Sequence, residues 1–372
     1  MAQGITPIVM PKWGLSMQEG TVMSWLVEEG TEITVGMPIL EVETDKIANA
    51  VEAADPGVLR RKVAQVGELL PVKALLGVMA DASVSDADVD AYIAAYETPS
   101  ADAGEDADAA PAYLWTEVDG LRVRYARRGA ASGTPVLFIH GYGGDLDNWL
   151  FNIDALAEAA PVIALDLPGH GQSAVQLPGT SLGALADFVA RFLDQLDVEQ
   201  VHVVGHSMGG AIASQLALAH PLRVASLALI APAGLGEDIN AGYTEGFAKA
   251  ASRRELKPVL EQLFNDPALV SRQMVDDVLK YKRLDGVEPL LLSLGQALFG
   301  DGRQAERPGL ELASTGKPVL VVWGAEDRVV PAAHITNAPP GATVERFEGA
   351  GHMVQMERAS DVNRLLRRHV GG

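Results

Sequence analysis

The sequence predicts two folded domains of different class: a small all-β sandwich over residues 1–80 and an α/β domain with a mainly parallel sheet over residues 113–372. Three observations carry this prediction. Residues 1–80 hold short apolar runs cut by glycine and proline. Residues 81–112 are mostly alanine, acidic residues, serine and proline, and beyond Tyr113 apolar runs alternate with helical patterns. A chain of 372 residues can bury one large and one small core.

Composition excludes several classes of function. The net charge is −20, so we expect no non-specific binding to nucleic acid or to anionic membranes. The chain has no cysteine, which excludes disulfides, thiolate metal sites and a cysteine nucleophile, and we expect no metal site. No apolar run reaches about 18 residues and the N-terminus lacks a signal-peptide pattern, so we expect a cytoplasmic protein without a membrane span.

An internal repeat indicates how the first domain is built. Gly20 matches Gly57 and Gly30 matches Gly67, an offset of 37 residues in both cases. Apolar positions repeat at the same offset, with Val22, Leu26, Ile33, Val35 and Ile39 matching Leu59, Val63, Leu70, Val72 and Leu76. Two similar strand sets predict a small sandwich with approximate two-fold symmetry.

Lys46 falls between the two repeats, where we expect a hairpin at the tip of the sandwich. The simplest interpretation is an exposed turn lysine. However, residues 11–20 (PKWGLSMQEG) followed by residues 43–46 (ETDK) resemble the lipoyl domain of 2-oxo-acid dehydrogenase complexes. This resemblance implies that Lys46 carries lipoate in amide linkage. The related biotinyl domains have methionines beside their lysine, whereas Asp45 and Ile47 flank Lys46.

Residues 81–112 are predicted to connect the two domains. They contain nine acidic residues and no lysine or arginine. Ser85 is expected to cap a short helix that ends near Tyr96. Residues 98–112 are expected to be disordered and to form a mobile tether spanning about 20 Å, although a spacer without mechanical role is the alternative. Acyltransferases of 2-oxo-acid complexes usually continue with a helical subunit-binding domain and a His-x-x-x-Asp-Gly motif, and this sequence has neither.

The second domain alternates strand and helix patterns. The interval 234–315 has helical patterns and no clear strand, so we expect a helical cap inserted above the carboxyl ends of the strands. Eight strands are expected at Leu114–Val118, Leu121–Tyr125, Val136–Ile139, Val162–Leu165, Val201–Val204, Leu227–Ile230, Val319–Trp323 and Thr343–Phe347.

Glycine-rich motifs follow five of these strands. They are HGYGG at 140–144, DLPGHGQS at 166–173, GHSMG at 205–209, GAEDRVVP at 324–331 and GAGHM at 349–353. GHSMG lies between an apolar strand and a helical pattern, which is the context of a nucleophile elbow. The set resembles the α/β-hydrolase family over the whole domain, and its order of serine, acid and histidine is the one that this fold uses.

These motifs supply candidate catalytic residues. A serine hydroxyl needs a base to become a nucleophile, so Ser207 is the candidate nucleophile and His352 the candidate base. Asp327 is the candidate that orients the base, with Glu326 as a rival. By resemblance, the backbone N–H groups of Tyr142 and Met208 form the oxyanion hole, while the Tyr142 ring could equally line the pocket.

Other candidates have a structural interpretation beside the functional one. The remaining seven histidines are expected to be structural, including His206, which cannot present its ring to the adjacent Ser207. Five residues of the insertion either line the substrate cleft or form the insertion's own core. They are Phe247, Phe264, Tyr281, Leu298 and Phe299.

The combination of the two domains resembles one family, the dihydrolipoyllysine-residue acetyltransferase components of bacterial acetoin dehydrogenase (acetoin-cleaving) systems. The resemblance implies a thiamine-diphosphate-dependent acetoin-cleaving partner, a flavin-dependent dihydrolipoyl dehydrogenase and coenzyme A as acyl acceptor. We expect acetyl transfer from the arm on Lys46 to Ser207 and then to coenzyme A. Two alternatives stay open: a carboxylesterase or thioesterase with a fused lipoyl domain, and a non-catalytic carrier or scaffold with a vestigial triad.

Overall fold

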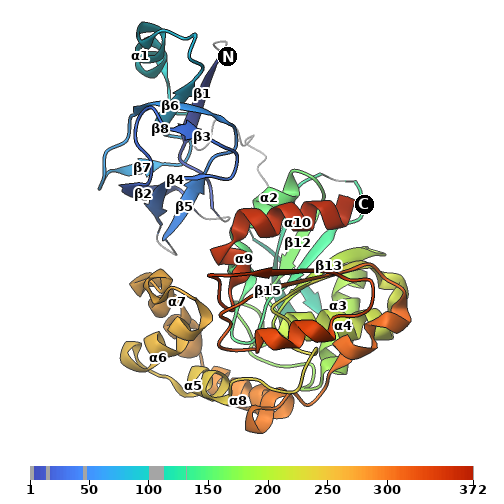
Figure 1. The fold of residues 1–372 in the computed structure, drawn as a ribbon. Helices are drawn as coiled ribbons and strands as arrows, with labels where there is room; N and C mark the ends of the chain where they lie inside the picture. Colours follow the sequence, from blue (N-terminus) through green and yellow to red (C-terminus); the bar gives the residue numbers. More distant parts are fainter. Residues whose placement is uncertain (1–3, 14–16, 45–47, 100–112, 131, 372) are drawn as a thin grey trace. The chain divides into compact units, whose positions relative to one another are not determined.

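The computed structural model describes residues 4–13, 17–44, 48–99, 113–130 and 132–371. The chain divides into two compact units, Met1–Pro111 and Ala112–Gly372. Figure 1 shows the first unit as strands with one short helix and the second as a sheet with helices on its faces.

The first unit is a sandwich of two four-stranded antiparallel sheets, ordered β1-β8-β6-β3 and β5-β4-β2-β7. The first four strands correspond to the last four: when β1, β2, β3 and β4 are exchanged with β5, β6, β7 and β8, the order of one sheet becomes the order of the other. The predicted two-fold arrangement is therefore confirmed. The strands are β1 (Ile5–Val9), β2 (Glu19–Trp25), β3 (Glu32–Ile33), β4 (Pro38–Glu43), β5 (Ala48–Glu52), β6 (Gly57–Lys62), β7 (Leu69–Pro71) and β8 (Leu75–Ala80).

The repeat predicts strand positions better than it predicts burial. Val22 and its repeat partner Leu59 are both fully buried in the sandwich core. Leu26 and Val35 are instead 47% and 64% exposed. The physical reason is that β2 ends at Trp25 and β3 at Ile33, so both side chains lie in turns that face solvent.

Helix α1 (Asp86–Ala95) packs on the sandwich. Ser85 caps it, with the serine hydroxyl oxygen accepting a hydrogen bond from the Asp88 N–H. Val89 is fully buried in a cluster with residues of β1 and β8, and Arg60 forms an ion pair with Asp86 (2.7 Å). The sequence prediction placed this helix in the connecting segment. Residues 100–112, to which the prediction of a mobile tether mainly applies, lie outside the described residues.

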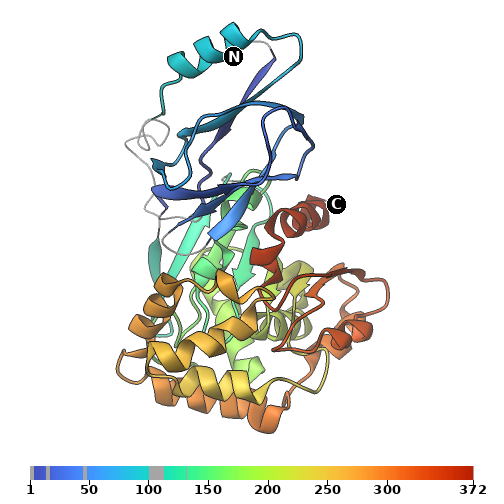
Figure 2. The ribbon, with the colours of Figure 1, turned by 60° about the vertical axis from the view of Figure 1, so that its left-hand side comes forward.

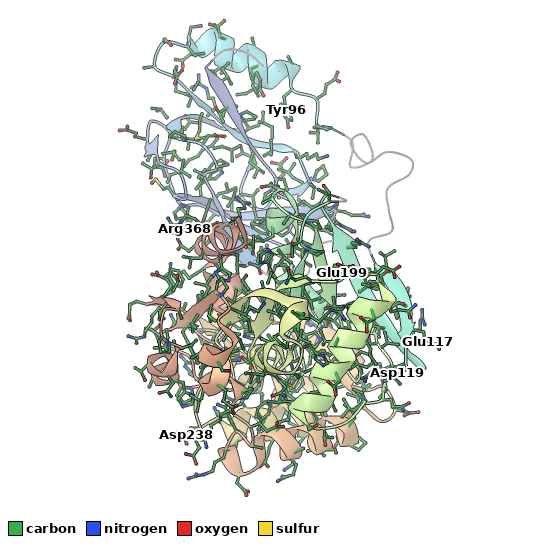
Figure 3. The ribbon with its side chains drawn as sticks, turned by 90° about the vertical axis from the view of Figure 1, so that its right-hand side faces the viewer. Tyr96, Glu117, Asp119, Glu199, Asp238 and Arg368 are labelled. Atoms are coloured by element: carbon green, nitrogen blue, oxygen red, sulfur yellow. The ribbon has the colours of Figure 1, made fainter. Side chains whose placement is uncertain are left out.

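The end of α1 is held by Tyr96, the residue near which the sequence predicted the helix to end, through a side-chain contact that the sequence did not predict. The hydroxyl of Tyr96, labelled in Figure 3, donates a hydrogen bond to the Lys73 carbonyl (2.8 Å). Arg61 adds an ion pair with Asp90 (3.1 Å). Helix α1 is therefore fixed to the sandwich by apolar burial and by contacts at both ends.

The second unit contains one eight-stranded sheet, ordered β16-β15-β14-β13-β11-β12-β10-β9. Strands β9 and β10 pair antiparallel, as do β10 and β12, and the other pairs are parallel. Every predicted strand is present. The strands are β9 (Leu114–Val118), β10 (Leu121–Arg128), β11 (Val136–Ile139), β12 (Val162–Leu165), β13 (Val201–His206), β14 (Val224–Ile230), β15 (Val319–Gly324) and β16 (Thr343–Phe347).

Helices cover both faces of this sheet, which explains why β11, β12 and β15 are buried along their whole length (Figure 2). Helices α3 and α4 contact each other on one face, and α2 and α10 contact each other on the opposite face. The helices are α2 (Ile153–Ala157), α3 (Leu182–Gln195), α4 (Met208–Ala219), α9 (Val354–Glu357) and α10 (Ala359–Gly371).

The insertion between β14 and β15 is helical, as predicted. Its entry and exit are joined by an isolated bridge between Asp238, labelled in Figure 3, and Arg303. None of the helices formed by the described residues combines the length and the apolar character that a membrane span requires. The helices of the insertion are α5 (Ala241–Lys249), α6 (Arg253–Leu260), α7 (Arg272–Lys282) and α8 (Val287–Phe299), with a 3-10 turn at Glu261–Leu263.

The packing of α1 gives a test of the first unit. Val89→Ala removes two buried carbon atoms and should weaken the docking of α1 by about 2 kcal/mol. Hydrogen exchange at the α1 amides of the full chain should accelerate accordingly. Ala91 is exposed, so Ala91→Ser is the control. It should change the free energy of opening that exchange reports by no more than about 0.5 kcal/mol, which is the difference in helix propensity between alanine and serine. Equal effects of the two substitutions would contradict the burial of Val89.

Candidate active site

Ser207 lies in a strained turn between β13 and α4. Its φ of 54° and ψ of −120° are rare for a residue with a side chain, and the Ser207 N–H is held by the Ile230 carbonyl (3.0 Å). Gly205 and Gly209 allow the turn, because a Cβ on either would collide with backbone atoms. The turn places the Ser207 hydroxyl at the carboxyl end of the central strand.

Asp327 and His352 come from the loops after β15 and β16 and meet in the buried interior. His352 Nδ1 lies 2.7 Å from Asp327 Oδ2. Because a carboxylate can only accept, Nδ1 carries the proton and Nε2 is left as the basic nitrogen. The carboxylate also accepts from Trp323 Nε1 (3.0 Å) and from the N–H groups of Val329 (2.8 Å) and Val330 (3.0 Å). Four donors therefore fix its orientation and stabilise its charge.

Glu326, the rival acid, has a different partner. Its carboxylate accepts a hydrogen bond from the Ala350 N–H (3.1 Å), and its own N–H donates to the Ala350 carbonyl (3.0 Å). Glu326 thus binds the backbone of the loop that carries His352, while Asp327 binds the ring.

The proposed oxyanion donors lie on either side of Ser207. Met208 is the first residue of α4, where backbone N–H groups have no acceptor within the helix. Tyr142 follows Gly141, whose Cα passes so close to the elbow that a Cβ would lie 3.0 Å from Ser207 Cβ. This close approach accounts for glycine at position 141. The structure thus places Met208 directly after Ser207 and the residue before Tyr142 against Ser207, while the role of the two N–H groups as oxyanion donors stays a prediction.

The Tyr142 side chain connects this loop to the insertion. Its hydroxyl donates to the Leu291 carbonyl of α8 (2.7 Å), and its ring makes edge contacts with Phe247 and Phe299. Burial raises the pKa of the Tyr142 hydroxyl, so it stays a neutral donor.

A buried ion pair supports the same loop. Asp166 Oδ2 accepts from Arg124 Nε (2.6 Å) and from the Gln172 N–H (2.8 Å), while Oδ1 accepts from the Leu146 N–H (2.9 Å). The DLPGHGQS motif is therefore tied to the segment that follows Tyr142. Arg124 was missed in the sequence, because a single arginine within a strand carries no signal of a buried partner.

A cavity of about 90 Å³ adjoins Ser207 and His352. Its remaining walls are residues 141–144, Asn148, His206, Met353, Met356 and the insertion side chains Tyr243, Phe247, Leu260, Leu263, Phe264, Met274 and Val278. Of the insertion residues singled out in the sequence, only Phe247 and Phe264 line it. Tyr281 donates from its hydroxyl to the Gly169 carbonyl (2.6 Å), and Leu298 and Phe299 are buried outside the lining.

His140 and His170 are buried, and both rings form hydrogen bonds with backbone groups. His140 Nδ1 donates to the Gly141 carbonyl (2.8 Å), and its Nε2 accepts from the Leu167 N–H (2.9 Å). Burial lowers the pKa of His140 to about 4 and that of His170 to about 3. Both rings are therefore neutral near pH 7.

The His206 ring packs against the His352 ring, with ring centroids 4.6 Å apart and the ring planes tilted by 53°. Its Nε2 donates to the His352 carbonyl (3.0 Å), so it supports the loop of the candidate base. Burial, and then the charge on His352, lower the pKa of His206 well below its usual value. A neutral His206 avoids placing a second positive charge beside the candidate base.

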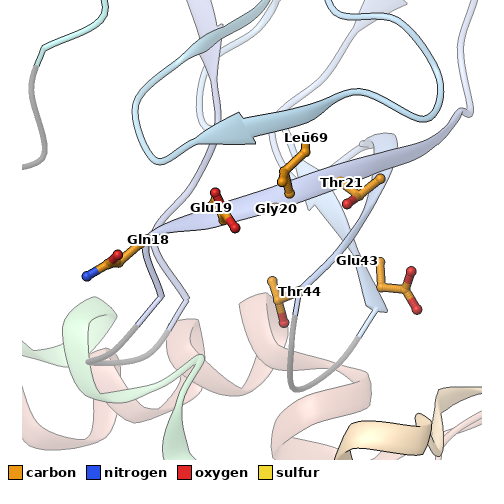
Figure 4. Close-up of a pocket in the computed structure, with 7 residues that line it drawn as sticks. All are labelled: Gln18, Glu19, Gly20, Thr21, Glu43, Thr44 and Leu69. Carbon is orange, nitrogen blue, oxygen red and sulfur yellow. The ribbon is translucent and has the colours of Figure 1, made fainter.

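The predicted cofactor lysine lies in the first unit between β4 and β5. These strands pair antiparallel up to Glu43 and Ala48, and Lys46 itself lies outside the described residues. A groove of about 380 Å³ beside this connection is lined by Gln18, Glu19, Gly20, Thr21, Glu43, Thr44 and Leu69 (Figure 4). Glu43, the last residue of β4, is exposed, and the groove beside it is mainly polar, which fits an amide-linked arm on Lys46.

Among the described residues, no cluster of three or more histidine, aspartate or glutamate side chains is arranged to hold a metal ion.

The fold and the arrangement of these three residues define an α/β-hydrolase-type protein with a serine nucleophile elbow. The alpha/beta hydrolase fold family matches residues 134–359, and the biotin/lipoyl family, described as "Biotin-requiring enzyme", matches residues 6–79. A solved meta-cleavage product hydrolase from Pseudomonas fluorescens has a TM-score of 0.63 and 25% identity, covering 69% of this chain and 97% of that chain.

Full-length relatives combine both domains. The dihydrolipoyllysine-residue acetyltransferase component of the acetoin cleaving system from Cupriavidus necator is 67% identical over 368 residues, which are 99% of this chain and 98% of that protein. The component with the same description from Pseudomonas putida is 49% identical over 370 residues, or 98% of this chain and 99% of that protein. The chain therefore belongs to the family of dihydrolipoyllysine-residue acetyltransferase components of acetoin cleaving systems.

The hydrogen bonds of Asp327 predict the effect of its substitution. Asp327→Asn places an amide N–H₂ group against N–H donors that the carboxylate accepts from. It also favours the His352 tautomer with the proton on Nε2, which cannot accept the proton of Ser207. We expect labelling of Ser207 by a fluorophosphonate probe to slow by about 10³- to 10⁴-fold. Glu326→Gln is the matched control and should slow labelling by less than about tenfold, since Glu326 does not contact the ring. Equal losses would contradict the assignment of Asp327.

The buried histidines predict an acid sensitivity. In the unfolded chain His140 has a pKa near 6.5, whereas in the folded chain it is about 4. The contribution of neutral His140 to the free energy of unfolding is fully present above pH 6.5. It is lost between pH 6.5 and about 4, because the unfolded chain binds the proton at a higher pH than the folded chain does. The slope is about 1.4 kcal/mol per pH unit for each such proton. Denaturant unfolding of His140→Asn across this range should show a shallower slope than wild type, and an unchanged slope would contradict a neutral buried His140.

Proposed function

We propose that this chain carries an acetyl group on a lipoylated Lys46 and transfers it to coenzyme A through an acetyl ester on Ser207. The family assignment supports an acyltransferase component of an acetoin cleaving system. The observation that carries the proposed route is the elbow of Ser207 beside a buried pair of His352 and Asp327. A chain that only carried the arm would have no need of this arrangement.

Lipoate supplies, when attached, a thioester-linked acetyl group on a long arm. Lys46 would hold it in the β4–β5 connection, where the antiparallel pairing ends at Glu43 and Ala48. The groove lined by Glu19, Thr21 and Thr44 is polar and would leave an apolar arm unburied. The arm is then free to leave the sandwich that bears it.

In the first step His352 Nε2 accepts the proton of the Ser207 hydroxyl while Ser207 Oγ bonds to the acetyl carbon. The carbon–sulfur bond breaks, and the proton passes from His352 to the departing sulfur. The backbone N–H groups of Tyr142 and Met208 donate to the oxygen that becomes negative. Each such donor stabilises a transition state by about 3 kcal/mol.

In the second step His352 accepts the proton of the coenzyme A thiol, and that sulfur bonds to the acetyl carbon. The ester bond to Ser207 breaks, and the proton returns from His352 to Ser207 Oγ. A thioester enters and a thioester leaves, so the transfer requires no oxidant or reductant. Asp327 keeps its charge and stabilises the imidazolium in both steps.

The cavity supports a small acyl group. Its volume of about 90 Å³ is well below the roughly 300 Å³ at which drug-sized ligand sites begin. Apolar side chains such as Phe247, Phe264 and Met274 form most of its wall. Such a wall disfavours the water that would hydrolyse the acetyl ester, so a thiol can compete.

Membership of an acetoin cleaving system implies further components of that system. We propose that they include a thiamine-diphosphate-dependent component that cleaves acetoin and loads the arm, and a flavin-dependent dihydrolipoyl dehydrogenase that reoxidises it. The transfer described above leaves the arm as a dithiol. That product requires an oxidising partner before another cycle.

The second candidate function is an esterase or thioesterase, in which water resolves the acyl ester. It is favoured by the likeness of the second unit to a solved meta-cleavage product hydrolase. Acetate in place of acetyl-CoA as the main product would identify it. A carrier or scaffold with an inactive triad is the third candidate, and absence of fluorophosphonate labelling at Ser207 would identify that one.

The assembled complex provides the decisive test. Ser207→Ala should lower acetyl-CoA formation from acetoin by about 10³-fold or more, because the nucleophile is lost while the arm is still loaded. Intact mass should show the lipoyl adduct in Ser207→Ala and its absence in Lys46→Arg, provided that the expression host can lipoylate. Undiminished acetyl-CoA formation by Ser207→Ala would refute the acetyl-serine route.

A further inference from the structure

The loop that carries His352 is joined directly to the cavity wall of the insertion. The Met353 N–H donates to the Leu263 carbonyl (3.0 Å). Gly351 passes so close to the insertion that a Cβ would lie 2.7 Å from the Asn265 nitrogen. Residues 263–265 and residues 351–353, here called the seam, are therefore in backbone contact.

Glu357 of α9 spans this seam with one side chain. Its Oε1 accepts from the Asn265 N–H (2.7 Å), and its Oε2 accepts from the Gly351 N–H (2.7 Å). Burial raises the pKa of this carboxyl group, and the backbone donors oppose that rise. The two bonds are short and charge-assisted, which is the stronger class of hydrogen bond.

The segment that Glu357 holds is part of the cavity wall. Leu263 and Phe264 both line the cavity beside Ser207, and Phe264 is almost completely buried. Asn265 follows them directly. A displacement of Asn265 would therefore move the wall of the space in which the acetyl group is expected.

Glu326 offers an internal comparison. It binds the N–H of Ala350, the neighbour of Gly351, and it belongs to the loop after β15. Two carboxylates thus hold two consecutive N–H groups of the same loop. Glu357 also binds the insertion, while Glu326 binds the loop from the side of the sheet.

We propose that Glu357 is a positioning residue that keeps the cavity wall closed over the acetyl ester and so determines whether a thiol or water accepts the acetyl group. The inference rests on the proposed acetyl-serine route. With the seam closed, the wall at Leu263 and Phe264 excludes water from the ester carbon. With the seam open, water reaches that carbon and the proton of the attacking water passes to His352, releasing acetate and free Ser207.

The first test compares two isosteric substitutions in the lipoylated full chain within the assembled complex. In Glu357→Gln the single amide oxygen can accept a hydrogen bond from only one of the two N–H groups, that of Asn265 or that of Gly351. The N–H₂ group then faces the other N–H, which loses its acceptor. We expect the ratio of acetate to acetyl-CoA to rise by about tenfold. Glu326→Gln should lower both products in equal proportion and leave the ratio unchanged. An unchanged ratio in Glu357→Gln, or an equal rise in Glu326→Gln, would overturn the proposal.

Gly351→Ala provides an independent variant, since its methyl group pushes the seam apart while Glu357 stays intact. It should raise the same product ratio, and a ratio equal to that of wild type would count against the seam. If Gly351→Ala does not fold, the comparison of Glu357→Gln with Glu326→Gln still tests the proposal.

Hydrogen exchange separates failure of this inference from failure of the proposed function. Glu357→Gln should accelerate exchange at residues 263–265, whereas Glu326→Gln should not, and neither result depends on acylation. If wild type forms no acetyl-Ser207, the proposed route and the claim about the acceptor both fail, while exchange still decides whether Glu357 holds the wall. Unchanged exchange in Glu357→Gln would overturn its positioning role.

Discussion

The backbone turn at Ser207 is the constraint on which the second unit depends. A positive φ at a residue with a side chain costs free energy, and surrounding structure must hold it. The Ile230 carbonyl does so from β14, and the glycines at 205 and 209 allow β11 and α4 to approach. Once the elbow is fixed, the base has to come from a loop at the same end of the sheet. Parallel strands supply such loops, because their carboxyl ends meet at one edge.

Buried charges near this turn are either paired with donors or avoided. Asp327 receives four donors, and Asp166 is paired with Arg124, so both buried carboxylates are compensated. The buried rings near them are kept neutral by desolvation, as the low pKa of His140 and His170 indicates. The imidazolium that forms on the base during transfer then faces one dominant charge, the carboxylate that orients it.

The two proposed attachment sites for the acyl group lie in different surroundings. The proposed carrier position lies in the connection between β4 and β5, while the proposed nucleophile, Ser207, is buried beside a cavity that side chains of the insertion line. Covalent delivery lets a small cavity suffice, because the arm supplies the local concentration that a large binding site would otherwise provide. Tyr142 binds α8 and Glu357 binds Asn265, so both side chains join the site loops to the insertion, and under the proposed route we expect these contacts to influence the choice of acceptor.

The sequence by itself determined the all-β class and internal repeat of the first unit, the strands of the second unit, and the positions of the elbow and of the loops after β15 and β16. These features are local, since they depend on apolar periodicity and on glycine at fixed offsets. Only the tertiary structure decided that Asp327 and not Glu326 contacts the His352 ring, and which of Phe264 and Tyr281 lines the cavity. These choices depend on contacts between residues far apart in the chain, for which neither periodicity nor spacing carries a signal. The burial of Arg124 against a carboxylate 42 residues away is of the same kind.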